Sequence, residues 1–126
     1  ITFREVFELM PFDNELVILT LTGQNILDLA QCFAEQGGQG ISGLRLEIRN
    51  GKAVNVKLNG KKIVPQMLYL VATSDYLSGG NDRMEPLSEY SSIWKSDAKI
   101  RDLYIEYIQL HPIVEGKVDG RTKIID

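Results

Sequence analysis

The sequence has few of the residues on which cross-linking, metal binding and catalysis usually depend. Its one cysteine, Cys32, excludes a disulfide within the chain, and its apolar helical surroundings predict a small buried residue rather than a nucleophile. Its one histidine, His111, stands before Pro112 with no second histidine or cysteine close by to share a zinc ion. We expect His111 to lie at the surface or to cap a helix. The sequence therefore predicts no catalytic residue, no metal ligand and no cofactor in this chain.

An excess of positive charge and a long apolar run are also lacking. The chain has 14 Lys and Arg residues against 17 Asp and Glu residues, which leaves no basic excess to neutralise nucleic-acid phosphates. No stretch approaches the roughly 18 consecutive apolar residues of a membrane-spanning helix, and the start lacks the pattern of a secretion signal. We therefore expect no nucleic-acid partner and no membrane span. The chain begins at Ile1 rather than at methionine, which suggests a processed chain or a fragment.

What is present is the composition of one compact domain over residues 1–126, with 44% hydrophobic residues. The nearly continuous apolar run from Leu16 to Leu21 is typical of a strand covered on both faces, so we expect it at the centre of a mixed sheet. Thr22 is placed to cap a helix that ends near Gln36, and a second helix ends near Leu110. We predict an α+β fold in which both helices pack on the central strand.

The rest of the chain predicts shorter elements. Residues 44–48 alternate in polarity, and Asn-Gly pairs at 50–51 and 59–60 turn the chain into strands at 54–58 and 68–73, which together predict a meander. Thr2 and Glu5 have the spacing of a capping box for a short helix that Pro11 ends. We also expect a helix capped by Ser96 or Asp97, whose apolar positions are Ile100, Leu103, Tyr104, Tyr107 and Ile108. An edge strand is expected at 122–125. Phe12 and Trp94 are expected to pack in the core.

Two glycine-containing segments are candidates for ligand contact. Residues 37–43 lead from a helix into a strand, the reverse of a phosphate-binding loop, so a helix terminator followed by a turn is the favoured interpretation. The loop at 74–86 is too rich in turn residues for a regular element, and it combines Tyr76 with Gly79, Gly80, Asn81 and Asp82. Such a loop can stack on a planar ligand and approach it closely, although spacing alone favours a structured turn with Tyr76 half-buried. No serine in either segment has the setting of a nucleophile.

Three stretches together resemble one family. Residues 9–17 (LMPFDNELV) and 21–23 (LTG) resemble the opening of the substrate-recognition domain found at the C-terminus of 5′-nucleotidases, a family that includes UDP-sugar hydrolases and 2′,3′-cyclic phosphodiesterases. Residues 69–82 (YLVATSDYLSGGND) resemble the nucleoside-binding loop of that domain, and residues 112–118 (PIVEGKV) its terminal segment. The order and spacing of the three stretches agree with the family, and the resemblance covers nearly the whole chain.

The resemblance implies a division of labour. In this family an N-terminal calcineurin-like metallophosphoesterase domain, absent from this chain, holds two divalent metal ions, while the C-terminal domain grips a nucleoside or nucleotide between two aromatic rings. Tyr76 matches one of these rings, Asp82 matches an aspartate that contacts the sugar or base, and Gly79, Gly80 and Asn81 form the backbone between them. The family resemblance also implies a secreted or periplasmic hydrolase that acts in nucleotide catabolism.

Two departures from the family pattern bear on the ligand. The second stacking ring of the family falls at the turn that contains Gly38, and residues 38–43 hold no aromatic residue. The Asn-Gly-Gly-Gly-x-Arg segment of the family, which also contacts the ligand, lies upstream of Ile1. Two functions therefore remain open, a nucleoside-recognition domain that serves a separate metal domain and a noncatalytic interaction domain that has lost nucleoside binding.

Overall fold

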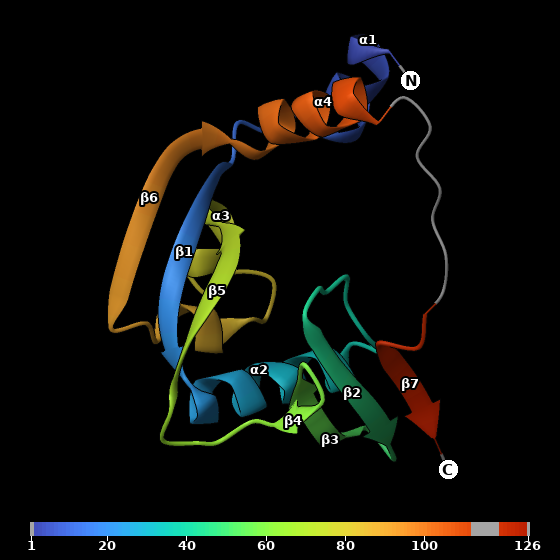
Figure 1. Cartoon of the computed structure of the whole chain (residues 1–126), viewed down its shortest axis with the longest axis vertical. Helices are drawn as coiled ribbons and strands as arrows, with labels where there is room; N and C mark the ends of the chain where they lie inside the picture. The colour runs from blue at the N-terminus through green and yellow to red at the C-terminus, as the bar shows by residue number, and fades with distance from the viewer. Residues whose placement is uncertain (1, 112–118, 126) are drawn as a thin grey trace.

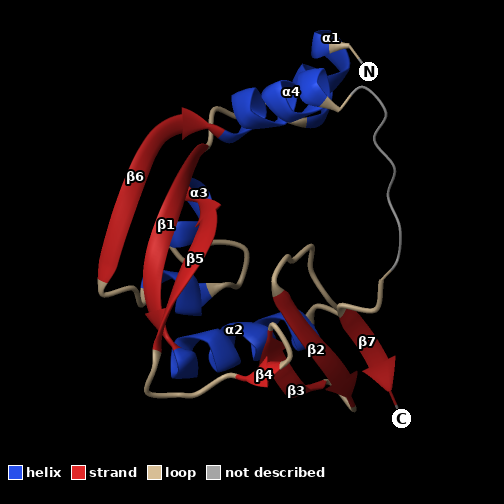
Figure 2. Cartoon of the chain, in the orientation of Figure 1, coloured by secondary structure: helices blue, strands red, loops and turns tan. Residues whose placement is uncertain are grey.

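The computed structural model describes residues 2–111 and 119–125, which form two β-sheets and the helices that connect them (Figures 1 and 2). The strand order is β5-β1-β6 in the first sheet and β4-β3-β2-β7 in the second. The longest helix, α2 (Gly23–Glu35), contacts β1 of the first sheet and β3 of the second. The α+β class predicted from the sequence is confirmed. The segment 112–118, part of the family resemblance, lies outside the described residues.

The three-stranded sheet is built around β1 (Glu15–Thr22), which is central as the apolar run predicted. It runs antiparallel to both β5 (Leu68–Ser74) and β6 (Ser92–Lys99). The sheet around β1 is therefore antiparallel, and not mixed as the sequence had predicted. Val17, Leu19 and Leu21 point to one side and are at most 1% exposed. The alternate residues of β1 face the other side and are only half-buried. Within the described part of the chain, one face of β1 is fully covered, whereas the sequence predicted cover on both.

The four-stranded sheet begins with the predicted antiparallel strands β2 (Leu44–Arg49) and β3 (Lys52–Leu58), followed by the short β4 (Lys61–Lys62). Asn50 and Asn59 and the glycine after each have positive φ, as tight hairpin turns require. The predicted edge strand, β7 (Thr122–Ile125), runs parallel to β2. It makes this sheet mixed.

The predicted continuation of the meander into β5 is wrong. The segment between β4 and β5 is tied to the first turn of α2, where the N–H groups of Gly23 and Gln24 donate to the carbonyls of Met67 (2.8 Å) and Pro65 (3.0 Å). This anchor directs the chain away from β4. β5 therefore pairs with β1 in the other sheet, where Val71 lies opposite Leu19.

Helix α2 begins at the predicted cap. The Thr22 hydroxyl accepts from the Asn25 N–H (3.1 Å), and the Asn25 side-chain oxygen accepts from the Thr22 N–H (3.2 Å). The predicted apolar face of the helix is buried in the core and consists of Ile26, Leu29, Ala30 and Phe33.

Two short elements lie within the loop at 74–86 that the sequence predicted to be irregular. They are the single-turn helix α3 (Asp75–Ser78) and the 3-10 helix η1 (Glu85–Ser88), which continues just past the loop. Ser74 caps α3 by accepting from the N–H of Leu77 (3.1 Å). Local side-chain capping thus organises the loop, although its composition suggested only turns.

The helices α1 (Phe3–Leu9) and α4 (Ile100–Leu110) contact each other at one end of the molecule (Figure 1). The predicted capping box of α1 is present, since the N–H of Glu5 donates to Thr2 (3.2 Å) and the N–H of Thr2 to the Glu5 carboxylate (3.3 Å). The predicted cap of α4 is wrong. Ser96 and Asp97 belong to β6, where the Ser96 hydroxyl donates to the Leu16 carbonyl (2.6 Å), and α4 begins only after Lys99.

The packing predicted for the aromatic residues and for α4 is also wrong. Phe12 and Trp94, expected in the core, are 73% and 58% exposed. Trp94 is exposed because it pairs with Ile18 on the side of β1 that faces away from α2. Helix α4 contacts α1 and β6 rather than lying across β1. Three of its predicted core positions, Leu103, Tyr104 and Tyr107, are exposed.

Candidate functional site

The loop that follows β5 holds Tyr76 in a defined position at the surface. Tyr76 is 48% exposed, and its hydroxyl donates to the Asp82 carboxylate (3.2 Å). The Asn81 side-chain amide donates to the Tyr76 carbonyl (2.6 Å), and the N–H of Tyr76 donates to the Asp75 carboxylate (2.8 Å). The structure therefore brings Tyr76, Asn81 and Asp82 together in one hydrogen-bonded loop.

The charge of Asp82 is the main reason that the pKa of Tyr76 is raised above its usual value, and the hydrogen bond between the two adds to the shift. Ionisation would place a phenolate beside a carboxylate, which is unfavourable. Tyr76 is consequently a neutral hydrogen-bond donor at neutral pH. A neutral, half-exposed aromatic ring can stack on a base.

The glycines of the loop shape its backbone. Gly80 has φ +81°, and a Cβ there would meet the side chain of Ser88 and the backbone of Glu85 at 3.3–3.4 Å. Gly79 ends α3, and a Cβ there would lie 3.3 Å from the Asn81 amide that holds Tyr76. Both glycines thus keep the chain close enough for the bonds of Asn81 and Asp82 to form.

The turn after α2 lies next to this loop. The Gln36 amide at the end of α2 donates to the Asp82 carbonyl (3.4 Å), and the Gln39 amide donates to the Gln36 side-chain oxygen (2.6 Å). Gly38 stands between these two residues with φ +119°, and a Cβ there would lie 3.4 Å from the Thr122 methyl group. Gly38 therefore lies on the turn beside the loop, in a conformation that side chains rarely adopt.

Arg121 supports the same turn from the C-terminal strand, a role that the sequence did not indicate. Its guanidinium donates to the Ile41 carbonyl (2.7 Å) and, through Nε, to the Asp119 carboxylate (2.8 and 3.0 Å). The hydrogen bond from Arg121 is the main reason that the pKa of Asp119 lies below its usual value. Because 80 residues separate Arg121 from Ile41, no local pattern could have revealed the contact.

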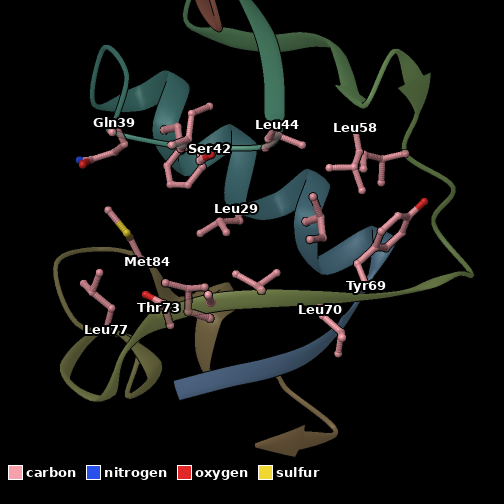
Figure 3. Close-up of a pocket in the computed structure, with 18 residues that line it drawn as sticks. Leu29, Gln39, Ser42, Leu44, Leu58, Tyr69, Leu70, Thr73, Leu77 and Met84 are labelled. Carbon is pink, nitrogen blue, oxygen red and sulfur yellow. The ribbon is translucent and has the colours of Figure 1, made fainter. Parts of the chain in front are cut away.

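An apolar cavity of about 350 Å³ adjoins the turn and the loop (Figure 3). It lies between α2, β5 and the segment from Gln39 to Leu44, and the loop contributes Leu77 and Met84 to its wall. Tyr76 and Asp82 are not among the residues that line it. The polar side chains on its wall include Gln39, Ser42 and Thr73, so the cavity favours apolar contact over recognition of charge.

The described residues offer little chemistry of their own. They contain no group of three or more His, Cys, Asp or Glu side chains that could hold a metal ion. His111 caps α4 and stacks on Tyr107 with the ring centroids 4.2 Å apart, and burial is the main reason that the pKa of the Cys32 thiol is raised. No helix in the described ranges is long and apolar enough to cross a membrane. The arrangement around Tyr76 is suited to binding.

Comparisons with known proteins place this architecture in a family. The sequence model of the family described as "5'-nucleotidase, C-terminal domain" matches residues 1–89. Protein UshA of Escherichia coli (strain K12) is 25% identical over 114 residues, and the match covers 84% of this chain and 21% of UshA. Protein UshA of Yersinia enterocolitica is 29% identical over 116 residues, again with 84% and 21% covered. The chain thus spans about a fifth of the length of these curated relatives.

Solved structures share the fold. The 5'-nucleotidase precursor from Thermus thermophilus superimposes with a TM-score of 0.88 at 22% identity, over 100% of this chain and 28% of that one. The NAD nucleotidase of Haemophilus influenzae gives a TM-score of 0.77 at 23% identity, with 98% and 26% covered. Since the family match extends over well more than half of the sequence and the fold agrees, the chain belongs to the 5′-nucleotidase C-terminal domain family.

Proposed function

We propose that this chain is the nucleoside-recognition part of a secreted or periplasmic 5′-nucleotidase-like phosphoester hydrolase. In this proposal Tyr76 stacks on the base and Asp82 accepts hydrogen bonds from the sugar or base. The backbone of Gly79, Gly80 and Asn81 and the turn at Gly38 flank the ligand. A separate N-terminal metallophosphoesterase domain carries two divalent metal ions, which polarise the phosphoryl group and activate water. The chain itself binds and positions the substrate.

The observation that carries the proposal is the fixed, exposed ring of Tyr76. An aromatic side chain at the surface normally rotates, and a ligand that stacks on it must first restrict that motion. Here bonds to Asp82 at the hydroxyl and to Asn81 and Asp75 at the backbone hold the residue in place, while Tyr76 stays 48% exposed. Family membership and the nucleotidase names of the relatives support a nucleoside as the ligand.

One observation favours the alternative, a noncatalytic interaction domain that has lost nucleoside binding. The turn at 38–43 carries no aromatic residue, so Tyr76 has no opposing ring from that side. With one ring left, we expect the site to bind nucleosides more weakly than a two-ring site, by roughly 5- to 150-fold. Reduced affinity and complete loss are separable by measurement.

Titration of the full-length protein with adenosine tests the proposal. Tyr76→Ala should raise the dissociation constant roughly 5- to 150-fold, because it removes the stacking surface. Tyr76→Phe is the matched control, since it keeps the ring and loses only the bond to Asp82, and its dissociation constant should stay within a few-fold of the wild type. If both variants bind adenosine as the unaltered protein does, Tyr76 does not contact the nucleoside and the loop is structural. If the unaltered protein itself does not bind adenosine, the interaction-domain alternative holds.

A further inference from the structure

Positive charge is concentrated in the four-stranded sheet. The chain as a whole has a formal charge of -3, yet residues 44–62 and 119–125, which form this sheet and its turns, hold eight of the 14 basic residues. Only two acidic residues, Glu47 and Asp119, occur in the same ranges. The negative net charge of the chain therefore hides a sheet of the opposite sign.

Most of these cations share the side of the sheet that faces away from the core. On β2, Leu46 and Ile48 belong to the core and are 2% and 4% exposed, so Arg45, Glu47 and Arg49 project from the other side. Residues that lie opposite one another on neighbouring strands project from the same side, which adds cations from the other three strands. We call this side the basic face and define it by Arg45 and Arg49 of β2, Lys52 and Lys57 of β3, Lys62 of β4 and Lys123 of β7.

Cations lie directly opposite one another on the basic face. Arg45 pairs with Lys57, which pairs in turn with Lys62, so a row of three cations crosses β2, β3 and β4. Arg49 likewise lies opposite Lys52. Like charges in such positions destabilise a sheet. A negatively charged partner would relieve this repulsion, so the arrangement favours one.

The chain itself offers these cations little compensating charge. Of the six, Arg45 alone forms an ion pair with a described residue, at 3.9 Å from the Asp119 carboxylate. The Glu47 carboxylate, beside Lys123, accepts a hydrogen bond from the Asn55 amide (3.0 Å). All six side chains except the half-buried Lys57 are exposed. Since lysine and arginine are rarely buried, we expect the basic face to stay in water in a longer protein as well.

We propose that the basic face binds the surface of a membrane that contains anionic phospholipids. Neighbouring strands lie about 4.8 Å apart and each residue rises about 3.3 Å, so the six cations spread over roughly 14 Å by 13 Å. A layer of anionic headgroups presents negative charge in two dimensions, and each lysine or arginine near it strengthens binding. Contact is at the headgroups and requires no membrane-spanning segment. The proposal does not depend on nucleoside binding.

Composition and shape favour a membrane surface over nucleic acid. Single-stranded nucleic acid is held in a groove by aromatic rings that stack on its bases, and residues 44–62 and 119–125 contain no aromatic residue. The grooves of a duplex admit a helix or a two-stranded ribbon, whereas the basic face is the broad side of a four-stranded sheet. Four of its six cations are lysines, which act as point charges, while paired hydrogen bonds to one phosphate favour arginine.

Co-sedimentation of the full-length protein with lipid vesicles tests the proposal. The protein should bind vesicles made of equal parts phosphatidylglycerol and phosphatidylcholine, and should not bind vesicles of phosphatidylcholine alone. Raising NaCl to about 0.5 M should release it, because salt screens exposed charges. Lys57→Gln combined with Lys62→Gln should weaken binding about 30-fold, as expected for two cations near the membrane surface.

A matched double variant is the control. Arg4→Gln combined with Lys95→Gln removes two exposed cations outside the basic face and should weaken binding less than about threefold. The Lys57 and Lys62 double variant should melt at or above the temperature of the unaltered protein, because it removes like charges that lie opposite each other. Equal binding to both kinds of vesicle, equal binding by the two double variants, or binding to heparin or duplex DNA but not to the vesicles would overturn the proposal.

Discussion

Replacement of Leu19 by Ala should destabilise the 126-residue chain more than the same change at an exposed leucine. Leu19 is fully buried at the centre of β1, where Val71 and Ile93 lie opposite it on the two neighbouring strands. Its removal leaves a cavity that three strands and α2 cannot easily close. We expect a loss of about 3–5 kcal/mol in the free energy of unfolding, a large part of the roughly 5–15 kcal/mol available to a small domain.

Urea denaturation followed by far-ultraviolet circular dichroism measures this loss. With a slope of about 2 kcal/mol per molar urea, the midpoint should fall by about 2 M. Leu70→Ala on the adjacent strand is the matched control and should cost less than about 1 kcal/mol in this chain, because Leu70 is exposed there. Leu19→Asp should prevent folding altogether, since it buries an unpaired charge. Equal midpoints for the two alanine variants, or cooperative unfolding of Leu19→Asp, would refute the assignment of β1 as the core strand.

Three further predictions concern the site. The folded-state pKa of Asp119 is lowered by Arg121, so its contribution to stability is present at neutral pH and is lost as the pH falls below about 4. The protection factors of the amides in the turn at 38–43, which correct for the intrinsic slowing of exchange in acid, should fall from pH 6 to pH 3, and Arg121→Gln should lower them at both pH values. Gly38→Ala should lower the melting temperature, because Gly38 has φ +119° and alanine is strained there. Gly40→Ala is the control and should not lower it, because a Cβ at Gly40 meets open space. Equal melting temperatures for the two variants would contradict this. The 126-residue chain should release no phosphate from AMP with added divalent metal, and metal-dependent release that survives further purification would disprove the division of labour.

Local signals in the sequence predicted most of the individual elements. The caps at Thr2 and Thr22 and the Asn-Gly turns act through contacts three residues apart or less, so their chemistry is visible in a short window. Pairing between distant strands has no such signal. The sequence therefore predicted a meander where the contact between Gly23 and Met67 sends β5 to β1.

The same distinction separates what could be predicted about the site. Tyr76 and Asp82 stand six residues apart in one loop, and their spacing together with the family resemblance marked them as candidates. Their hydrogen bond could not be foreseen, because it depends on the positive φ of Asp82 and on the short helix α3. Arg121 and Gln36 reach the site from other elements. Burial was expected for Trp94 and for one face of α4 because these side chains are apolar. In the described part of the structure they are exposed instead.

The central position of β1 has a consequence for the order of folding. Leu16 pairs with Ser74 and Glu15 with Lys99, so both partners of this strand come from much later in the chain, whereas β2 and β3 are joined by a two-residue turn. Contacts of large sequence separation form slowly, because a long loop must close before they gain any stability. We expect the β2–β3 hairpin to form early and β1 to wait for β5 and β6. During synthesis the most apolar strand of the domain is thus the one that stays unpaired longest, and it is the segment that most needs protection from aggregation.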